Sequence, residues 1–203
     1  QGNLYSKTLS GQNTSELNKS MESQKKNFKG NELKGKTLGI IGLGAIGSLL
    51  AQTAEVMGMN IIGYDPYISI DAAWRLPKDV EKADSMEYLL NNSDYISIHV
   101  PLVDETRDLI SKESLKHFKK GAKLINLSRG GIVNNEDIVE ALNSKLIDKF
   151  VTDFPTPELV TRSNDFHDVI LLPHLGASTK EAEINRAVMA AEQISNFLKD
   201  GTQ

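Results

Sequence analysis

The 203-residue chain contains no cysteine. Disulfide bonds, thiolate zinc sites, iron–sulfur clusters and a cysteine nucleophile are therefore excluded, and the absence is compatible with a reducing cytoplasm. Long apolar runs are also lacking. The longest, residues 38–50, is interrupted by four glycines and a serine, and it is far shorter than the roughly 20 residues that cross a membrane. The N-terminus shows no basic-then-apolar signal pattern either, so we expect neither secretion nor membrane insertion.

Positive charge is not in excess, because 23 lysines and arginines face 27 aspartates and glutamates, for a net charge of -4. A chain that binds nucleic acid or an anionic membrane broadly would carry the opposite balance. We therefore expect no nucleic-acid partner and no membrane partner. We also expect no metal site. At this length one domain, or two, can bury a core without disulfides.

The chain divides into three regions that differ in composition and in the spacing of their apolar residues. Residues 1–30 are polar, with too few apolar side chains to enclose a core, so this arm is either a helix that needs a partner surface or a solvated leader. Residues 31–178 alternate short apolar runs with longer helical patterns, as βαβ units do. Residues 179–203 carry apolar side chains at helical spacing and predict a long amphipathic helix.

The middle region predicts a doubly wound parallel sheet of the Rossmann type, because right-handed crossovers place helices on both faces. Its ligands should collect beyond the carboxyl ends of the strands. The candidate strands are residues 37–41, 60–64, 95–98, 123–126, 150–151 and 169–171, and the clearest helices are residues 45–57, 111–118 and 135–143.

A glycine-rich turn joins the first strand to the first helix. It reads Gly42-Leu43-Gly44-Ala45-Ile46-Gly47, with a strand before it and an apolar helix after it. Such a turn lets a pyrophosphate reach the backbone and the helix N-terminus. Asp65 ends the next strand, where its carboxylate can accept hydrogen bonds from the ribose of NAD and would repel the 2′-phosphate of NADP. Alternatively, the glycines only shape a tight turn and Asp65 caps a loop.

Chemistry-bearing side chains follow other strands at the same edge. His99 ends one strand, where its backbone can line a nicotinamide pocket, although a packing role is equally open. His174 follows the last strand. Arg129 lies in a Ser-Arg-Gly-Gly turn, where its guanidinium can hold a carboxylate with two hydrogen bonds or can tie down its own loop. His117 and His167 lie in polar stretches and are expected at the surface.

Taken together, these segments resemble the D-2-hydroxyacid dehydrogenases, and among them the phosphoglycerate dehydrogenases. The matching stretches are GKTLGIIGLGAIG, GYDPYISIDAAW, DYISIHVPLVDETRDLI, INLSRGGIVNNEDIVEAL, VTDFPTPEL and LLPHLGASTKEAE, which occur in the family's order over residues 35–183. GLGAIG is common to many dinucleotide-binding proteins, whereas SRGGIVN followed by PHLGAST is more specific.

The resemblance implies a role for each matching residue. Arg129 would hold the substrate carboxylate, His174 would act as the acid/base, and Asp153 would contact the nicotinamide carboxamide. The family usually has a glutamate that pairs with the histidine. An alignment on Phe-Pro-Thr puts Pro157 at the position of that glutamate, whereas an alignment on Asp153 puts Glu158 there. We prefer Glu158, because proline cannot pair with an imidazolium. The implied NAD-binding residues are Gly42, Gly44, Ala45, Ile46, Gly47, Asp65, His99, Val100, Pro101, Ser128, Asp153 and His174.

The resemblance also bears on the extent of the chain and its partners. Family members carry a further stretch before the cofactor domain that forms most of a substrate-binding domain, and here only residues 1–30 stand in that place. We therefore expect an NAD-binding domain of a homodimeric enzyme acting on a 2-hydroxy acid such as 3-phosphoglycerate, in serine biosynthesis, with weak or no turnover by this polypeptide alone. A rival interpretation is a non-catalytic, dinucleotide-responsive interaction module similar to corepressors of this fold.

Overall fold

The computed structural model describes residues 9–201. The chain forms two compact units, and the first ends at Lys34 and the second begins at Gly35. The first unit contains helix α2 (Thr14–Gln24) and the 3-10 helix η1 (Lys25–Phe28). Asn13 caps α2 and exchanges hydrogen bonds with Glu16, so the first turn is closed by a capping box. No side chain of α2 is buried. Residues 1–8 of the predicted arm lie outside the described residues, and the division at residues 30 and 178 stays a prediction.

The second unit contains the predicted doubly wound sheet, which is confirmed. Seven parallel strands lie in the order β3-β2-β1-β4-β5-β6-β7, so the strand order reverses between β1 and β4. That reversal is the place where an open α/β sheet binds ligands. The strands are β1 (Thr37–Ile41), β2 (Asn60–Tyr64), β3 (Glu81–Lys82), β4 (Tyr95–Ile98), β5 (Ala122–Asn126), β6 (Ile147–Thr152) and β7 (Val169–Leu171).

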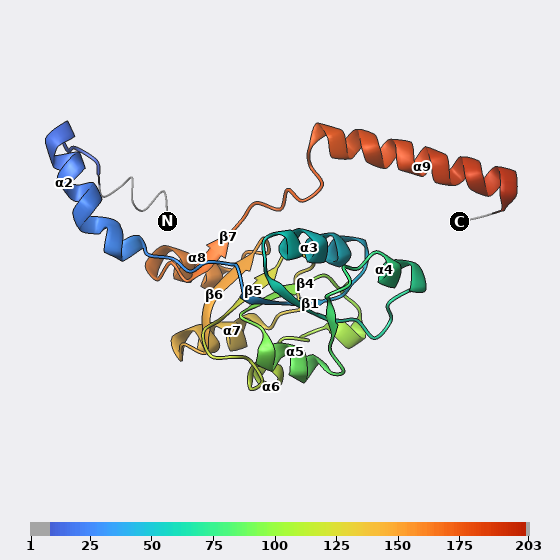
Figure 1. Ribbon diagram of the computed structural model, residues 1–203, viewed down its shortest axis with the longest axis horizontal. Coiled ribbons are helices and arrows are strands. Elements are labelled where there is room, and N and C mark those ends of the chain that lie inside the picture. Colours follow the sequence, from blue (N-terminus) through green and yellow to red (C-terminus); the bar gives the residue numbers. More distant parts are fainter. Residues whose placement is uncertain (1–8, 202–203) are drawn as a thin grey trace. The chain divides into compact units, whose positions relative to one another are not determined.

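Helices cover both faces of this sheet (Figure 1). The helices of this unit are α3 (Ala45–Val56), α4 (Ile70–Trp74), α5 (Met86–Asn92), α6 (Lys112–Leu115), α7 (Asn135–Asn143), α8 (Pro157–Asp165) and α9 (Lys180–Asp200), with the 3-10 helix η2 (Asp104–Thr106). Neighbouring residues of a strand point to opposite faces. Ile40 accordingly packs in a core cluster with α3, whereas Ile41 packs in a larger cluster with α5, α6 and α7.

The structure differs from the predicted elements by more than one residue at three places. Strand β3 was not predicted, because its two residues are charged and exposed and carry no apolar pattern. Strand β6 begins at Ile147 rather than at residue 150, since Asp148 and Lys149 interrupt the apolar run that marked its second half. Helix α6 has only four residues where residues 111–118 were expected.

The C-terminal region forms the long helix that the apolar spacing predicted. Thr179 caps α9, and Gly201 ends it with a φ of 66°, the left-handed conformation that closes many helices. Its apolar side chains, among them Ile184 and Phe197, are exposed. Among the described residues no helix combines the length and the apolarity that crossing a bilayer requires.

A buried ion pair joins α8 to the start of β7. Arg162 is only 6% exposed, and it donates from Nε and Nη2 to the two carboxylate oxygens of Asp168 at 2.9 and 2.7 Å. Its Nη1 donates to Oδ1 of Asn143 at 2.7 Å, and its guanidinium lies 4.9 Å from the centre of the Phe166 ring. Such a two-pronged pair fixes the orientation of both groups as well as their separation. It therefore sets the position at which β7 enters the sheet.

Candidate active site

The turn between β1 and α3 requires glycine at its first position. Gly42 has a φ of 92°, a conformation that side chains disfavour. A Cβ on Gly42 would also lie 2.6 Å from the carbonyl oxygen of His99, at the end of the neighbouring strand β4. The turn and the end of β4 are thus in direct backbone contact at the topological reversal of the sheet.

The third glycine of the turn brings the helix close to the strand. A Cβ on Gly47 would overlap the carbonyl oxygen of Gly42, whereas a Cβ on Gly44 would meet no atom within 4 Å. Gly44 is the N-cap of α3, and no side chain caps that helix. The helix start therefore offers amide hydrogens and the positive end of its dipole to an anion that approaches Gly44.

Asp65 fastens the end of β2 to this turn. Its Oδ2 accepts a hydrogen bond from the amide of Leu43 at 2.8 Å, and its Oδ1 accepts one from the amide of Tyr67 at 2.9 Å. Asp65 therefore does cap the loop that follows β2, as the alternative interpretation of the sequence held. Each oxygen keeps a further lone pair, so these bonds leave room for hydroxyl donors.

The segment after β4 lies against the same turn. Nε2 of His99 and Oγ of Ser97 are 2.8 Å apart, and burial lowers the pKa of the His99 imidazole, which favours its neutral form. Val100 is half-buried beside Gly42, and the carbonyl of Pro101 accepts a hydrogen bond from Oγ1 of Thr106 at 2.6 Å. His99 therefore has a packing role, and its predicted contact with nicotinamide stays a prediction.

Asn126, at the end of β5, organises the Ser-Arg-Gly-Gly turn. It is buried; its Oδ1 accepts hydrogen bonds from the amide and hydroxyl of Ser128, and its Nδ2 donates to the carbonyl of Arg129 at 2.9 Å. The guanidinium of Arg129 is exposed, and Nη1 donates to the carbonyl of Ser128 at 2.6 Å. Sequence reasoning missed Asn126, although an amide that ends an apolar strand just before this turn was the available signal.

His174 and Asp153 meet at the ends of β7 and β6. Nδ1 of His174 lies 2.8 Å from Oδ2 of Asp153, and the His174 ring is tilted against Phe154 with the two ring centres 5.0 Å apart. The imidazole is 58% exposed, whereas the Asp153 carboxylate is buried and its Oδ1 has no hydrogen-bond partner. A carboxylate only accepts hydrogen bonds, so Nδ1 donates to it and Nε2 is left for another group.

In this structure His174 is bonded to Asp153, and its predicted pairing with Glu158 stays a prediction. Glu158 stands in the first turn of α8, where it lines a hollow with Asp108, Gly131 and Asn134. In the described part of the chain Glu158 and His174 form no ion pair. The physical reason is topological: Asp153 directly follows β6, whose neighbour β7 leads to His174, whereas Glu158 has already turned away into a helix.

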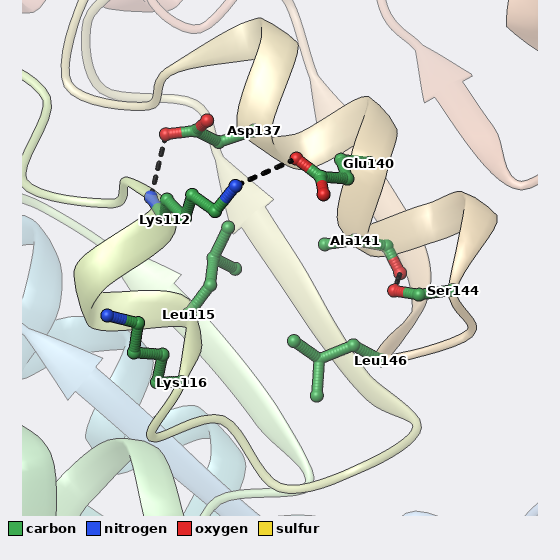
Figure 2. A pocket seen from close by; sticks show the side chains of 8 residues that line it. All are labelled: Lys112, Leu115, Lys116, Asp137, Glu140, Ala141, Ser144 and Leu146. Atoms are coloured by element: carbon green, nitrogen blue, oxygen red, sulfur yellow. Dashed lines mark hydrogen bonds and ion pairs between the residues drawn. The ribbon is translucent and has the colours of Figure 1, made fainter.

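A second hollow lies between α6 and α7 (Figure 2). Lys112 reaches across it, with Nζ 3.6 Å from Glu140 and its amide donating to Asp137 at 2.7 Å. The floor is apolar, with Leu115 and Leu146 beneath the charged side chains. Because Lys112 is paired with Glu140 and the hollow contains none of the residues at the strand ends, we do not assign it the chemistry.

Comparison with known proteins agrees with this geometry. The family model for the NAD binding domain of D-isomer specific 2-hydroxyacid dehydrogenases matches residues 6–176. The chain belongs to this family. The resemblance that the sequence indicated and its NAD cofactor are thereby confirmed.

Individual relatives of this NAD-binding domain show how much of such a protein it covers. A D-3-phosphoglycerate dehydrogenase of Synechocystis is 42% identical over 188 residues, which are 90% of this chain and 33% of that protein. The one of Bacillus subtilis is 39% identical over 186 residues, 89% of this chain and 34% of that protein. The domain thus spans about a third of the length of these curated relatives.

Solved structures agree with the fold. The NAD+-bound 3-phosphoglycerate dehydrogenase of Entamoeba histolytica superposes with a TM-score of 0.71 at 32% identity, covering 86% of this chain and 55% of that one. The NAD complex of a D-isomer specific 2-hydroxyacid dehydrogenase of Lactobacillus delbrueckii gives a TM-score of 0.73 at 26% identity, covering 86% and 58%.

The residues of this domain fit NAD. The open space at Gly44 faces an uncapped helix start, and the buried Oδ1 of Asp153 lacks a partner at the same strand edge. A buried oxygen without a donor is costly, so a donor supplied by a ligand would stabilise it. The carboxamide group of a nicotinamide carries such a donor.

Two glycine variants separate the packing of the turn from its anion-binding surface. Gly47→Ala is expected to lower the free energy of unfolding by about 1–3 kcal/mol and to weaken NADH binding, because the added methyl group must displace the Gly42 carbonyl. Gly44→Ala is expected to leave stability nearly unchanged and still weaken NADH binding, because its methyl group enters the open space of the proposed phosphate site. Urea denaturation and NADH titration of both variants measure the two effects; equal stability of the two variants would contradict the packing argument.

Proposed function

We propose that this domain binds NAD and provides the cofactor half of an enzyme that transfers a hydride between NAD and a D-2-hydroxy acid, with 3-phosphoglycerate as the substrate. The observation that carries the proposal is the His174–Asp153 pair, whose exposed imidazole lies at the same edge of the sheet as the glycine turn. A general acid/base and a dinucleotide turn at one edge are what such a reaction requires.

The proposed cofactor contacts follow from the strand ends. The amides that open α3, including those of Ala45, Ile46 and Gly47, would hold the pyrophosphate, and the free lone pairs of Asp65 would accept the ribose hydroxyls. The nicotinamide would lie over the segment that follows β4, with Asp153 Oδ1 as the acceptor for its carboxamide. The residues proposed to line it are His99, Val100, Pro101 and Ser128.

The proposed chemistry divides between the cofactor and two side chains. NAD, when bound, supplies the hydride acceptor. Nε2 of neutral His174 takes the hydroxyl proton while the carbonyl forms, and Oδ2 of Asp153 accepts the hydrogen on Nδ1 throughout. Arg129 would hold the substrate carboxylate with the guanidinium nitrogens that its bond to Ser128 leaves free. The reverse reaction uses the same groups, with the imidazolium as the acid.

Phosphoglycerate as substrate and serine biosynthesis as setting rest on the relatives. Both D-3-phosphoglycerate dehydrogenases match about nine tenths of this chain. The cytoplasm is proposed as the location, in keeping with the absence of cysteine.

We further propose a homodimer that forms through this domain. Large apolar side chains are exposed on α3 and α4, among them Leu49, Val56 and Trp74, the last at 84%. The two helices are joined where Nε2 of Gln52 donates to the carbonyl of Arg75 at 2.7 Å. Exposed apolar patches of this kind mark protein–protein contacts.

Titration with NADH and NADPH tests the proposed function directly. NADH is expected to bind saturably and at least about tenfold more tightly than NADPH, because the Asp65 carboxylate would repel a 2′-phosphate. Calorimetry and nucleotide fluorescence measure both affinities, and Asp65→Asn is expected to bring them closer together. Absence of any heat or fluorescence change at millimolar NADH would refute the proposal.

A further inference from the structure

We infer that Ser48 is a positioning residue for the dinucleotide, because its hydroxyl fixes the direction of the peptide bond between Leu43 and Gly44. The inference rests on the proposed function and adds to it a residue near the start of α3. Oγ of Ser48 donates a hydrogen bond to the carbonyl of Leu43 at 2.7 Å, and this bond is buried. The Ser48 residue is 2% exposed.

The carbonyl of Leu43 depends on this hydroxyl. Leu43 precedes Gly44, the N-cap of α3, so its carbonyl stands outside the hydrogen bonds of the helix. Among the described residues no backbone amide donates to it, whereas the next carbonyl, that of Gly44, accepts the amide of Ser48 at 3.0 Å. A buried carbonyl without a donor is costly. Removal of the hydroxyl would therefore favour a rotation that turns this oxygen toward water.

Glycine makes the peptide bond between Leu43 and Gly44 free to rotate in this way. Rotation of a peptide unit changes ψ of the residue before it and φ of the residue after it. Gly44 tolerates values of φ that other residues disfavour, and the space beside it is open. The rest of Leu43 is held, because its amide donates to Asp65 and its side chain is buried. Ser48 is thus the constraint on the one end of Leu43 that can move.

The direction of this peptide decides what the turn presents to an anion. In a planar trans peptide the carbonyl and the amide hydrogen point to opposite sides. Since the Leu43 carbonyl faces the buried hydroxyl, the Gly44 amide faces the exposed side, beside the amides that open α3. A rotated peptide would present a carbonyl oxygen there, which repels a phosphate. Ser48 therefore keeps a donor, and not an acceptor, at the proposed pyrophosphate site.

Ser93 provides a matched control. It is fully buried, and its Oγ donates to the carbonyl of Leu89 at 2.6 Å. It is the C-cap of α5 and lies against Gly39 in the middle of β1, away from the glycine turn. Ser93→Ala removes the same kind of buried bond as Ser48→Ala, so it separates a general loss of stability from an effect on the turn.

NADH titration, melting curves and NMR of the isotope-labelled chain test the inference. Ser48→Ala is expected to weaken NADH binding about tenfold, the effect of losing one hydrogen bond to a charged group. Ser93→Ala is expected to lower the melting temperature to a similar extent and to keep the affinity, and Ser48→Thr, which retains a hydroxyl, should stay within about twofold of it. In the nucleotide-free chain the Gly44 amide should give a single sharp signal, which Ser48→Ala broadens or doubles.

Three results would overturn the inference: unchanged NADH affinity in a folded Ser48→Ala, an equal loss of affinity in Ser93→Ala, or a loss in Ser48→Thr as large as in Ser48→Ala. Where Ser48→Ala does not fold, the unaltered chain still decides, because more than one conformation of its Gly44 amide contradicts a fixed peptide. Absence of NADH binding by the unaltered chain refutes the proposed function instead. The Gly44 signal needs no nucleotide, so the two failures are distinguishable.

Discussion

Replacement of His174 by alanine is expected to lower kcat of the complete gene product by about 10²- to 10⁴-fold, the usual contribution of a general acid/base. The affinity for NADH should change little, because the imidazole contacts Asp153 and Phe154 and lies on a different strand end from the glycine turn. Steady-state kinetics and NADH titration of the same preparation measure both quantities. The exposed position of the ring also predicts an almost unchanged melting temperature.

The control for this variant is His117→Ala. His117 is half-buried beside α6, and its imidazole faces Glu87 at 3.6 Å, so its loss should leave both turnover and NADH affinity intact. Equal losses of turnover and NADH affinity in His174→Ala would argue against a proton-transfer role. Full activity in that variant would assign the proton transfer to another group. Absence of turnover in the unaltered protein, with NADH binding retained, would favour the rival interpretation, in which the domain is a non-catalytic, dinucleotide-responsive interaction module.

Arg162→Met is expected to lower the free energy of unfolding by about 3–5 kcal/mol, the cost of leaving one partner of a buried ion pair alone. The variant would keep Asp168 buried, with the more distant Lys145 as its remaining cation at 3.8 Å. Urea denaturation followed by circular dichroism measures the loss. Because β7 begins next to Asp168, the loop that carries His174 should also become more susceptible to proteolysis.

A double variant separates the lone charge from lost packing. Arg162→Met combined with Asp168→Leu removes both charges and should recover much of the lost stability, since apolar pairs of similar volume often replace buried ion pairs without loss. Arg186→Met, on the exposed surface of α9, serves as the control and should change stability little. A double variant as unstable as Arg162→Met would show that the guanidinium stabilises the fold by packing and by its bond to Asn143.

The sequence predicted those parts of the fold that have a strong local cause. Gly42 and Gly47 mark the first turn because no other residue fits there. The six apolar strands were found for the same reason, because buried parallel strands are nearly continuous runs of apolar residues. Strand β3 could not be predicted from the sequence, because its pairing with β2, and not its composition, makes it a strand.

The sequence predicted which site residues lie at the ends of strands, but not which of their side chains bond to each other. Parallel strands bring their carboxyl ends to one edge, so Arg129, His174 and Asp65 could be placed there from the order of elements alone. Which side chain pairs with which depends on side-chain direction and on where α8 begins, so the bond between His174 and Asp153 could not be predicted from a linear pattern. The bonds from Asn126 to its loop are equally invisible in a linear pattern.

The sheet's outer strand β3 has a consequence for behaviour in concentrated solution. It has only two residues, Glu81 and Lys82, and both are charged and exposed. An approaching strand from another molecule would find few free main-chain groups to pair with and would have to bury opposite charges to reach them. We therefore expect this border of the protein to resist fibre-like growth, even though the strands behind it are strongly apolar.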